Sequence, residues 1–199
     1  MVWIRTIEPA DASGRLKEAY DWQARRLGQP TEFTQLGSLD AEIVHARLIL
    51  YRATENVDSA LTFRQRELIS YLTSILNSTP HCAALSRTQL RQAEENDLVA
   101  ILDRGDYDQL GPADAALARY VHKVTVAPGS VTEDDIAALR AAGFTDVDIL
   151  DANNRTAHLN YTNRVANGLG LLSEPVEEER SLTRVPGYEE AEASFKPGS

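Results

Sequence analysis

Cys82 is the only cysteine in this 199-residue chain, and the residues around it read as a redox motif with one thiol missing. In the stretch "STPHCAALS", Thr79 lies three positions before the thiol, where a C-x-x-C protein has its first cysteine. Thr79 is a suitable N-cap residue, and Pro80 suits the first helical position, where an N–H would have no partner. The spacing therefore predicts that Cys82 lies in the first turn of a helix.

A thiol in that position can do chemistry. The positive end of a helix dipole and the unpaired N–H groups of the first turn favour the thiolate, which is the nucleophilic form. His81, when protonated, would add to this effect. Glu67, on the preceding predicted helix, could orient an imidazole or carry a proton, because an apolar pocket raises the pKa of a carboxyl group. The Thr79 hydroxyl could bind the Cys82 N–H or a ligand.

Each of these residues also has a purely structural interpretation. A lone cysteine is commonly a small buried apolar residue, and Thr79 could act only as a cap. Glu67 could be an exposed helix carboxylate paired with Arg64 or Arg66. The sequence leaves both sets of interpretations open.

A second polar group of residues lies in the last predicted helix, within and just beyond "DANNRTAHLN". Five side chains recur there at three- and four-residue spacing and so share one helix face: Asp151, Asn154, Arg155, His158 and Thr162. Burying them without partners would cost about 1–3 kcal/mol for each unsatisfied group. The face therefore either meets solvent, or lines a wet pocket or subunit interface in which Arg155 and His158 bind a polar or anionic substrate.

Hydrophobic residues recur with the helical period along the chain, and no run alternates as a strand would. The sequence predicts an all-α protein in two helical halves, the second beginning after "LDRGDYDQLG". The predicted helices lie within 12–28, 41–53, 61–77, 81–96, 113–124, 133–143 and 146–168.

The helix ends carry recognisable signals. Gly28 closes the first helix, and Ser38 is the expected cap of the second. Thr62 and Gln65 form a capping box, in which each side chain binds a backbone N–H of the other residue. Thr132 and the pair Thr145-x-x-Asp148 are expected to begin the last two helices, and Gly168 to end the chain's final one.

Composition limits the classes of partner. The formal net charge of −10 argues against nucleic acid and anionic membranes, which both require a basic surface. A single cysteine excludes an internal disulfide and fits a reducing compartment, and no apolar run is long enough to span a membrane. We therefore expect a cytoplasmic protein with one domain over residues 1–173. Residues 174–199, with seven glutamates, are expected to form a loosely ordered acidic extension.

Neither a metal nor a cofactor is expected. His45 and His122 lie in amphipathic helices without the spacing of metal ligands. The "NGLG" segment at the end of the last helix lacks the glycine pattern of a phosphate-binding loop.

Three longer stretches point to a family: "IEPADASGRLKEAYDWQARRLGQ", "FRQRELISYLTSILNSTPHCAALS" and "AAGFTDVDILDA…LNYTNRVANGLGL". With them the chain, from about Ile4 to Leu171, resembles the alkyl hydroperoxidase D-like and carboxymuconolactone decarboxylase superfamily, particularly its peroxidase-related branch. The resemblance implies an alkyl hydroperoxidase D-like helical bundle. It also implies a homo-oligomer acting on a small-molecule substrate.

The resemblance also assigns site residues. Glu67 matches the family's glutamate twelve residues before the first cysteine, His81 its inner histidine, and Cys82 its second, peroxide-reactive cysteine. Two positions depart from the pattern, because Thr79 replaces the first cysteine and Ser86 replaces the outer histidine. The first change removes the internal disulfide, and the second removes part of the proton relay. Thr79 and Ser86 could still contact substrate, although Ser86 could equally serve only in packing.

Three functions are compatible with these residues. The favoured hypothesis is an acid–base enzyme of the decarboxylase, lyase or isomerase kind, with Glu67 and His81 as acid–base groups and Arg155 as a carboxylate clamp. The second is a one-cysteine thiol peroxidase, in which peroxide oxidises Cys82 to a sulfenic acid that an external thiol resolves. The third is a non-catalytic oligomeric binding protein.

Overall fold

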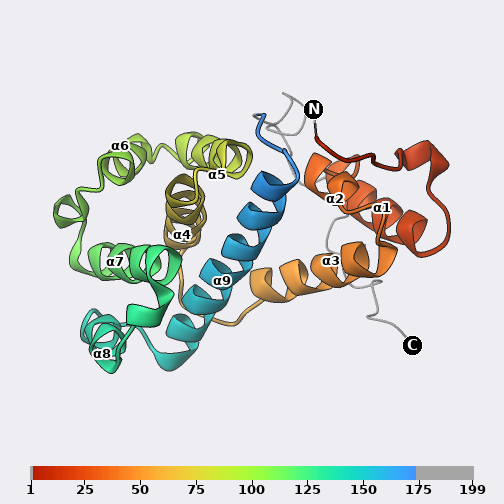
Figure 1. Cartoon of the computed structure of the whole chain (residues 1–199). Helices are drawn as coiled ribbons and strands as arrows, with labels where there is room; N and C mark the ends of the chain where they lie inside the picture. The colour runs from red at the N-terminus through yellow and green to blue at the C-terminus, as the bar shows by residue number, and fades with distance from the viewer. Residues whose placement is uncertain (1, 174–199) are drawn as a thin grey trace. The chain divides into compact units, whose positions relative to one another are not determined.

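The computed structural model describes residues 2–173, and the regular secondary structure in that range is all helical, as the sequence predicts (Figure 1). The α-helices are α1 (Gly14–Leu27), α2 (Glu32–Leu36), α3 (Ala41–Glu55), α4 (Phe63–Leu76), α5 (Pro80–Gln92), α6 (Asn96–Arg104), α7 (Pro112–Val126), α8 (Glu133–Ala141) and α9 (Asp146–Gly168). Short 3-10 helices cover Pro9–Asp11, Tyr107–Gln109 and Pro128–Ser130. The predicted acidic extension, 174–199, lies outside the described residues.

Local signals set most helix ends where they were predicted. Gly28 follows α1 with a φ of 83°, a conformation that glycine adopts without strain. The capping box of Thr62 and Gln65 is formed at the start of α4. At the start of α9, Asp148 accepts a hydrogen bond from the Thr145 amide at 2.8 Å. Each of these signals depends on residues at most a few positions apart, so sequence alone suffices to predict them.

Two predicted boundaries are wrong. Ser38 does not cap α3, because its hydroxyl accepts the Ile7 amide at 2.7 Å, and Asp40 accepts the Ile43 amide instead at 3.1 Å. The helix expected over 81–96 ends at Gln92, where Glu94 adopts a left-handed φ of 62°. A separate helix, α6, then begins at Asn96. The short α2 also lies in a stretch where no helix was predicted.

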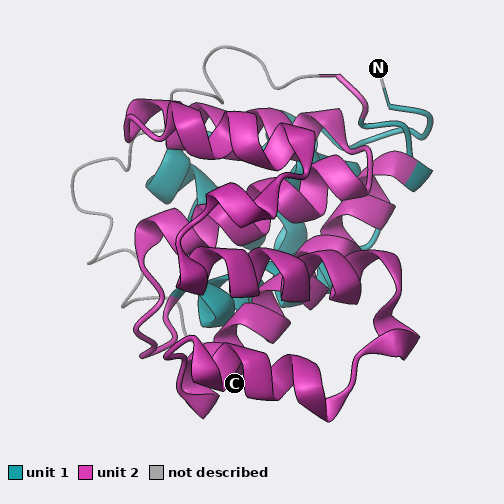
Figure 2. Ribbon diagram, turned by 90° about the vertical axis from the view of Figure 1, so that its left-hand side faces the viewer, with its two compact units in different colours: residues 1–55, 168–171, 175–199 teal, residues 56–167, 172–174 magenta. Residues whose placement is uncertain are grey.

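The chain forms two compact units, which Figure 2 colours separately. Among the described residues, unit 1 contains 2–55 and 168–171, and unit 2 contains 56–167 and 172–173. The units therefore divide after Glu55, whereas the sequence placed the start of a second half after Gly111. The reason is that α6 and the segment after it share a core with α4, α5 and α7.

In unit 1, α1 packs against α3. Their shared core consists of Leu16, Ala19, Tyr20, Trp22, Val44 and Leu48. The Tyr20 hydroxyl, at the edge of this core, donates to the Ile7 carbonyl at 2.9 Å. This bond satisfies the polar end of a side chain that is otherwise buried.

In unit 2, α4 is the central element, because it packs against both α5 and α7. Its fully buried residues Leu68, Ile69 and Leu72 form the middle of the main core. The helices α7, α8 and α9 share a smaller core of Tyr120, Leu139 and Ile149. Within residues 2–173, no helix is both long and apolar enough to cross a membrane.

Candidate active site

The predicted motif lies where α4 turns into α5. Ser78 adopts a left-handed φ of 53°, which is uncommon for a residue other than glycine. The Ser78 amide donates to the Ile75 carbonyl at 3.0 Å, and the Thr79 amide donates to the Ser74 carbonyl at 2.9 Å. This pair of bonds is the Schellman arrangement, which satisfies carbonyls at the end of α4. It holds the chain so that α5 can start two residues later.

Thr79 is the N-cap of α5 and Pro80 its first residue, as predicted. The Thr79 side chain makes no capping hydrogen bond; its hydroxyl is directed to the Asn77 carbonyl, 3.5 Å away. Cys82 lies in the first turn of this 13-residue helix and is partly exposed. The thiol is thus not the fully buried apolar residue of the structural interpretation.

His81 is 1% exposed, and its Nδ1 lies 3.1 Å from the carbonyl oxygen of Ser173. A carbonyl can only accept, so Nδ1 carries the proton and donates it. In the neutral ring, Nε2 is then the unprotonated nitrogen. Ser173 follows α9 and was not among the predicted site residues, because a backbone carbonyl leaves no signal in a sequence.

Glu67 is 9% exposed on α4, which contradicts the interpretation of this residue as an exposed helix carboxylate. The neighbouring arginines each contact an acid: Arg64 donates to Asp114 at 2.9 Å, and Arg66 lies 3.2 Å from Asp151. Enzymes commonly use a buried carboxyl group as an acid or base.

Ser86 is also buried, four residues after Cys82 on α5. Thus one helical hairpin, α4 and α5, carries five of the seven predicted site residues: Glu67, Thr79, His81, Cys82 and Ser86. The roles of these residues remain predictions.

The polar stripe of α9 is partly buried, so it is not a solvated face throughout. Asp151 is 0% exposed and Arg155 is 5% exposed, whereas Asn154 is exposed and His158 is partly buried. Asp151 accepts a hydrogen bond from the Ser59 hydroxyl at 2.5 Å. The stripe is thus mixed, with Asp151 and Arg155 inside the protein and Asn154 at its surface.

The turn before Cys82 is held by a set of side-chain amides that were not among the predicted site residues. The Asn77 side-chain amide donates to Asn160 Oδ1 at 2.9 Å. The Asn167 side-chain amide donates to the Asn77 carbonyl, also at 2.9 Å. Asn160 and Asn167 are seven residues apart and so lie on one face of α9. The sequence shows this spacing, but it does not show that both residues contact Asn77.

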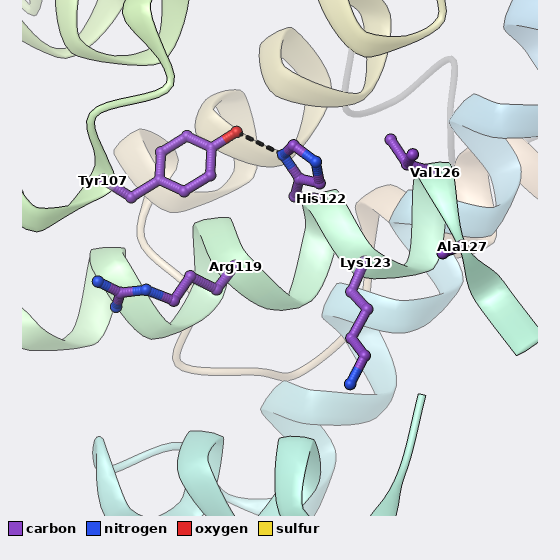
Figure 3. A pocket seen from close by; sticks show the side chains of 6 residues that line it. All are labelled: Tyr107, Arg119, His122, Lys123, Val126 and Ala127. Carbon is purple, nitrogen blue, oxygen red and sulfur yellow. Dashed lines mark hydrogen bonds between the residues drawn. The ribbon is translucent and has the colours of Figure 1, made fainter. Parts of the chain in front are cut away.

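The other polar features of the described residues lie apart from the predicted site. Among residues 2–173, no group of three His, Cys, Asp or Glu side chains could hold a metal ion. A shallow hollow of about 380 Å³ is lined by Tyr107, Arg119, His122, Lys123, Val126 and Ala127 (Figure 3). In it the Tyr107 hydroxyl lies 2.9 Å from His122 Nδ1. None of the predicted site residues lines this hollow.

No protein-family model and no curated protein matches the chain. Solved structures do match it. One, described as an alkylhydroperoxidase AhpD core and an uncharacterized peroxidase-related protein, comes from Ralstonia eutropha JMP134. It has a TM-score of 0.77 and 26% identity, over 89% of this chain and 94% of that one.

A second, an uncharacterized peroxidase-related protein from Silicibacter sp. TM1040, has a TM-score of 0.72 and 23% identity over 87% of this chain and 94% of that one. A third is the debrominase Bmp8, in a cysteine-to-alanine variant bound to 2,3,4-tribromopyrrole. Its TM-score is 0.70, with 12% identity over 89% of this chain and 93% of that one. The chain therefore has the fold of the alkyl hydroperoxidase D-like superfamily, as its sequence predicts.

Proposed function

We propose that this protein is a one-cysteine thiol peroxidase that reduces small hydroperoxides, with Cys82 as the reacting group. The observation that carries the proposal is the position of Cys82: the residue is partly exposed, and it lies in the first turn of a helix whose N-cap side chain makes no capping hydrogen bond. Such a position favours the thiolate and lets a small substrate reach it. Two structural neighbours described as peroxidase-related support the same assignment.

In the proposed reaction, the Cys82 thiol first gives its proton to the Glu67 carboxylate. The thiolate then attacks the terminal oxygen of a hydroperoxide, forming an S–O bond as the O–O bond breaks. The departing alkoxide takes the proton back from Glu67 and leaves as an alcohol. The sulfur has been oxidised by two electrons to the sulfenic acid, and the peroxide has been reduced by two.

An external small thiol completes the cycle in the proposal. It attacks the sulfenic sulfur, releases water and forms a mixed disulfide, and a second thiol then releases Cys82 and leaves as the oxidised disulfide. The external thiol is required because Thr79 replaces the cysteine that would otherwise resolve the sulfenic acid. His81 is not the proton acceptor in this proposal, because adjacent helical residues point in different directions and do not face each other. Its assistance would be electrostatic.

The first prediction concerns the reactivity of Cys82. The reduced protein is mixed in a stopped-flow instrument with hydrogen peroxide or tert-butyl hydroperoxide, and the sulfenic acid is trapped with dimedone and counted by mass spectrometry. We expect one sulfenic acid per chain and none in Cys82→Ser. Glu67→Gln should react more slowly while keeping its fold, because it cannot carry the proton.

The matched control places a thiol at an exposed site, Ser130→Cys in the Cys82→Ser background. Cys82 should react about tenfold faster or more than this control at pH 7, because only a few per cent of an ordinary thiol is ionised there. Equal rates for the two thiols would contradict the peroxidase assignment.

A second candidate is the acid–base enzyme of the decarboxylase, lyase or isomerase kind. Burial of Glu67 on α4 and of Arg155 on α9 favours it, because a buried acid and a buried cation are the groups such chemistry uses on an anionic substrate. The complex of Bmp8 with 2,3,4-tribromopyrrole supports binding of a small organic molecule in this fold. If Cys82 reacts with hydroperoxide no faster than the exposed control thiol, the acid–base enzyme becomes the better assignment.

A further inference from the structure

Helix α3 is apolar on two opposite faces. One face packs into the core of unit 1 through Val44 and Leu48. On the other side, Leu39 just before the helix and Ile43 and Leu50 within it are 46%, 45% and 49% exposed. A surface helix normally turns polar residues outward, so this second apolar face requires an explanation of its own.

The exposed face follows a strict repeat. Its residues recur at alternating spacings of four and three: Leu39, Ile43, Ala46, Leu50 and Ala53. This is the a/d pattern by which one helix packs along another. None of the five positions is polar, and all five are exposed. The face is called the α3 stripe below.

The sizes of the side chains in the α3 stripe alternate between large and small. When two copies of α3 run antiparallel, a and d positions oppose each other across the seam. Ile43 then faces Ala53 of the second copy, and Ala46 faces Leu50 of the second copy. Each bulky residue thus meets a small one, as close packing requires. A parallel pair would instead set Leu50 against Leu50 and leave a gap between two copies of Ala46.

The antiparallel match has a further consequence. A two-fold axis near the middle of the helix repeats each contact with the two copies exchanged, so one surface is complementary to itself. That is the property of an isologous interface, the commonest kind in homodimers. Antiparallel packing also places the opposite ends of the two helix dipoles side by side.

We propose that the α3 stripe is a self-association surface, on which a second copy of this chain packs through its own α3 in antiparallel orientation. This surface lies wholly within unit 1 and uses none of the residues assigned to peroxide chemistry. The inference is therefore independent of the proposed function.

The second prediction tests this surface in the full chain. Light scattering after size exclusion should give wild type a mass of at least two chains. Leu50→Glu should raise the dissociation constant about 100-fold, because each copy would bury an unpaired charge at the seam. The matched control is Leu150→Glu on α9, where the replaced leucine is similarly exposed at 57%. A monomeric wild type, or a dimer that only the control disrupts, would overturn the proposal.

Cross-linking checks the orientation and does not depend on the folding of the charged variant. In a Cys82→Ser background, Ala46→Cys is mixed with Leu50→Cys and oxidised gently. Antiparallel packing predicts a disulfide between the two different variants in higher yield than within either one alone. Preferential linkage of Ala46→Cys to itself would exclude the antiparallel arrangement.

Discussion

At the scale of single residues, the hydrogen bond of His81 determines what its ring can do. The Ser173 carbonyl accepts from Nδ1 at 3.1 Å, so this contact selects the tautomer that is protonated at Nδ1. The contact of His122 selects no tautomer, since the Tyr107 hydroxyl, 2.9 Å from its Nδ1, can either donate or accept. A carbonyl partner therefore determines the state of one ring, whereas a hydroxyl partner leaves both tautomers of the other open.

The third prediction is a direct measurement of the His81 tautomer. Nitrogen-15 NMR of the neutral ring should show His81 protonated at Nδ1, because the Ser173 carbonyl can only accept. The variant His81→Asn assigns the signal by its loss, and His122→Asn serves as the matched control that should leave it in place. A neutral His81 ring protonated at Nε2 would contradict the assigned contact with Ser173.

At the scale of elements, α9 is anchored at its first turn by one carboxylate. Asp148 is buried, and its two oxygens accept three hydrogen bonds, from the Thr145 amide, the Thr145 hydroxyl and the Ala60 amide. Burial raises the pKa of Asp148, but these hydrogen bonds outweigh burial and hold the pKa below its ordinary value. The same carboxylate therefore caps α9 and secures the segment that leads into α4.

The fourth prediction follows from the lowered pKa. Its stabilising effect is fully present above the unfolded pKa of about 3.9 and is lost as the pH falls toward the folded value. At pH 7 the free energy of unfolding of Asp148→Asn should be about 1–3 kcal/mol lower than that of wild type, because the new amide group cannot accept all three hydrogen bonds. The difference should shrink below about pH 4, where wild type loses the same contribution.

Urea denaturation at pH 7 and pH 3 measures both quantities. Asp146→Asn is the matched control, since Asp146 lies in the same turn but is exposed. The free energy of unfolding of this control should differ from that of wild type by less than about 0.5 kcal/mol. A deficit of Asp148→Asn that is equally large at both pH values would argue against the role of the lowered pKa.

At the scale of the whole molecule, the chain passes between the two compact units more than once. It leaves unit 1 after Glu55, re-enters it at Gly168 and leaves it again after Leu171. Within unit 1, the Trp3 amide donates to the Leu169 carbonyl at 2.9 Å, so the first residues are held by residues that follow α9. Neither unit is therefore a continuous piece of the chain.

The fifth prediction is that the two units unfold together, as one domain over residues 1–173 requires. Both tryptophans, Trp3 and Trp22, belong to unit 1, so their fluorescence reports on that unit. Circular dichroism at 222 nm reports mainly on unit 2, which contains more of the helices. Thermal unfolding curves from the two signals should coincide. Midpoints separated by several degrees would show two domains instead of one.

Sequence alone was enough wherever the deciding contact is local. The capping box of Thr62 and Gln65, the glycine after α1 and the start of α5 at Pro80 each depend on residues a few positions apart. Their residue types are therefore sufficient to predict the element. The same holds for the fold class, because the helical period and the quoted family stretches extend over most of the chain.

Tertiary structure alone decided which polar residues are buried and what they contact. Glu67 and Arg155 could have met solvent, and only packing placed them inside. The partners of His81 and Asn77 lie 92, 83 and 90 positions away along the chain, at Ser173, Asn160 and Asn167. No local preference encodes such pairings. They form because a buried polar group must find a partner, and the fold determines which partner is within reach.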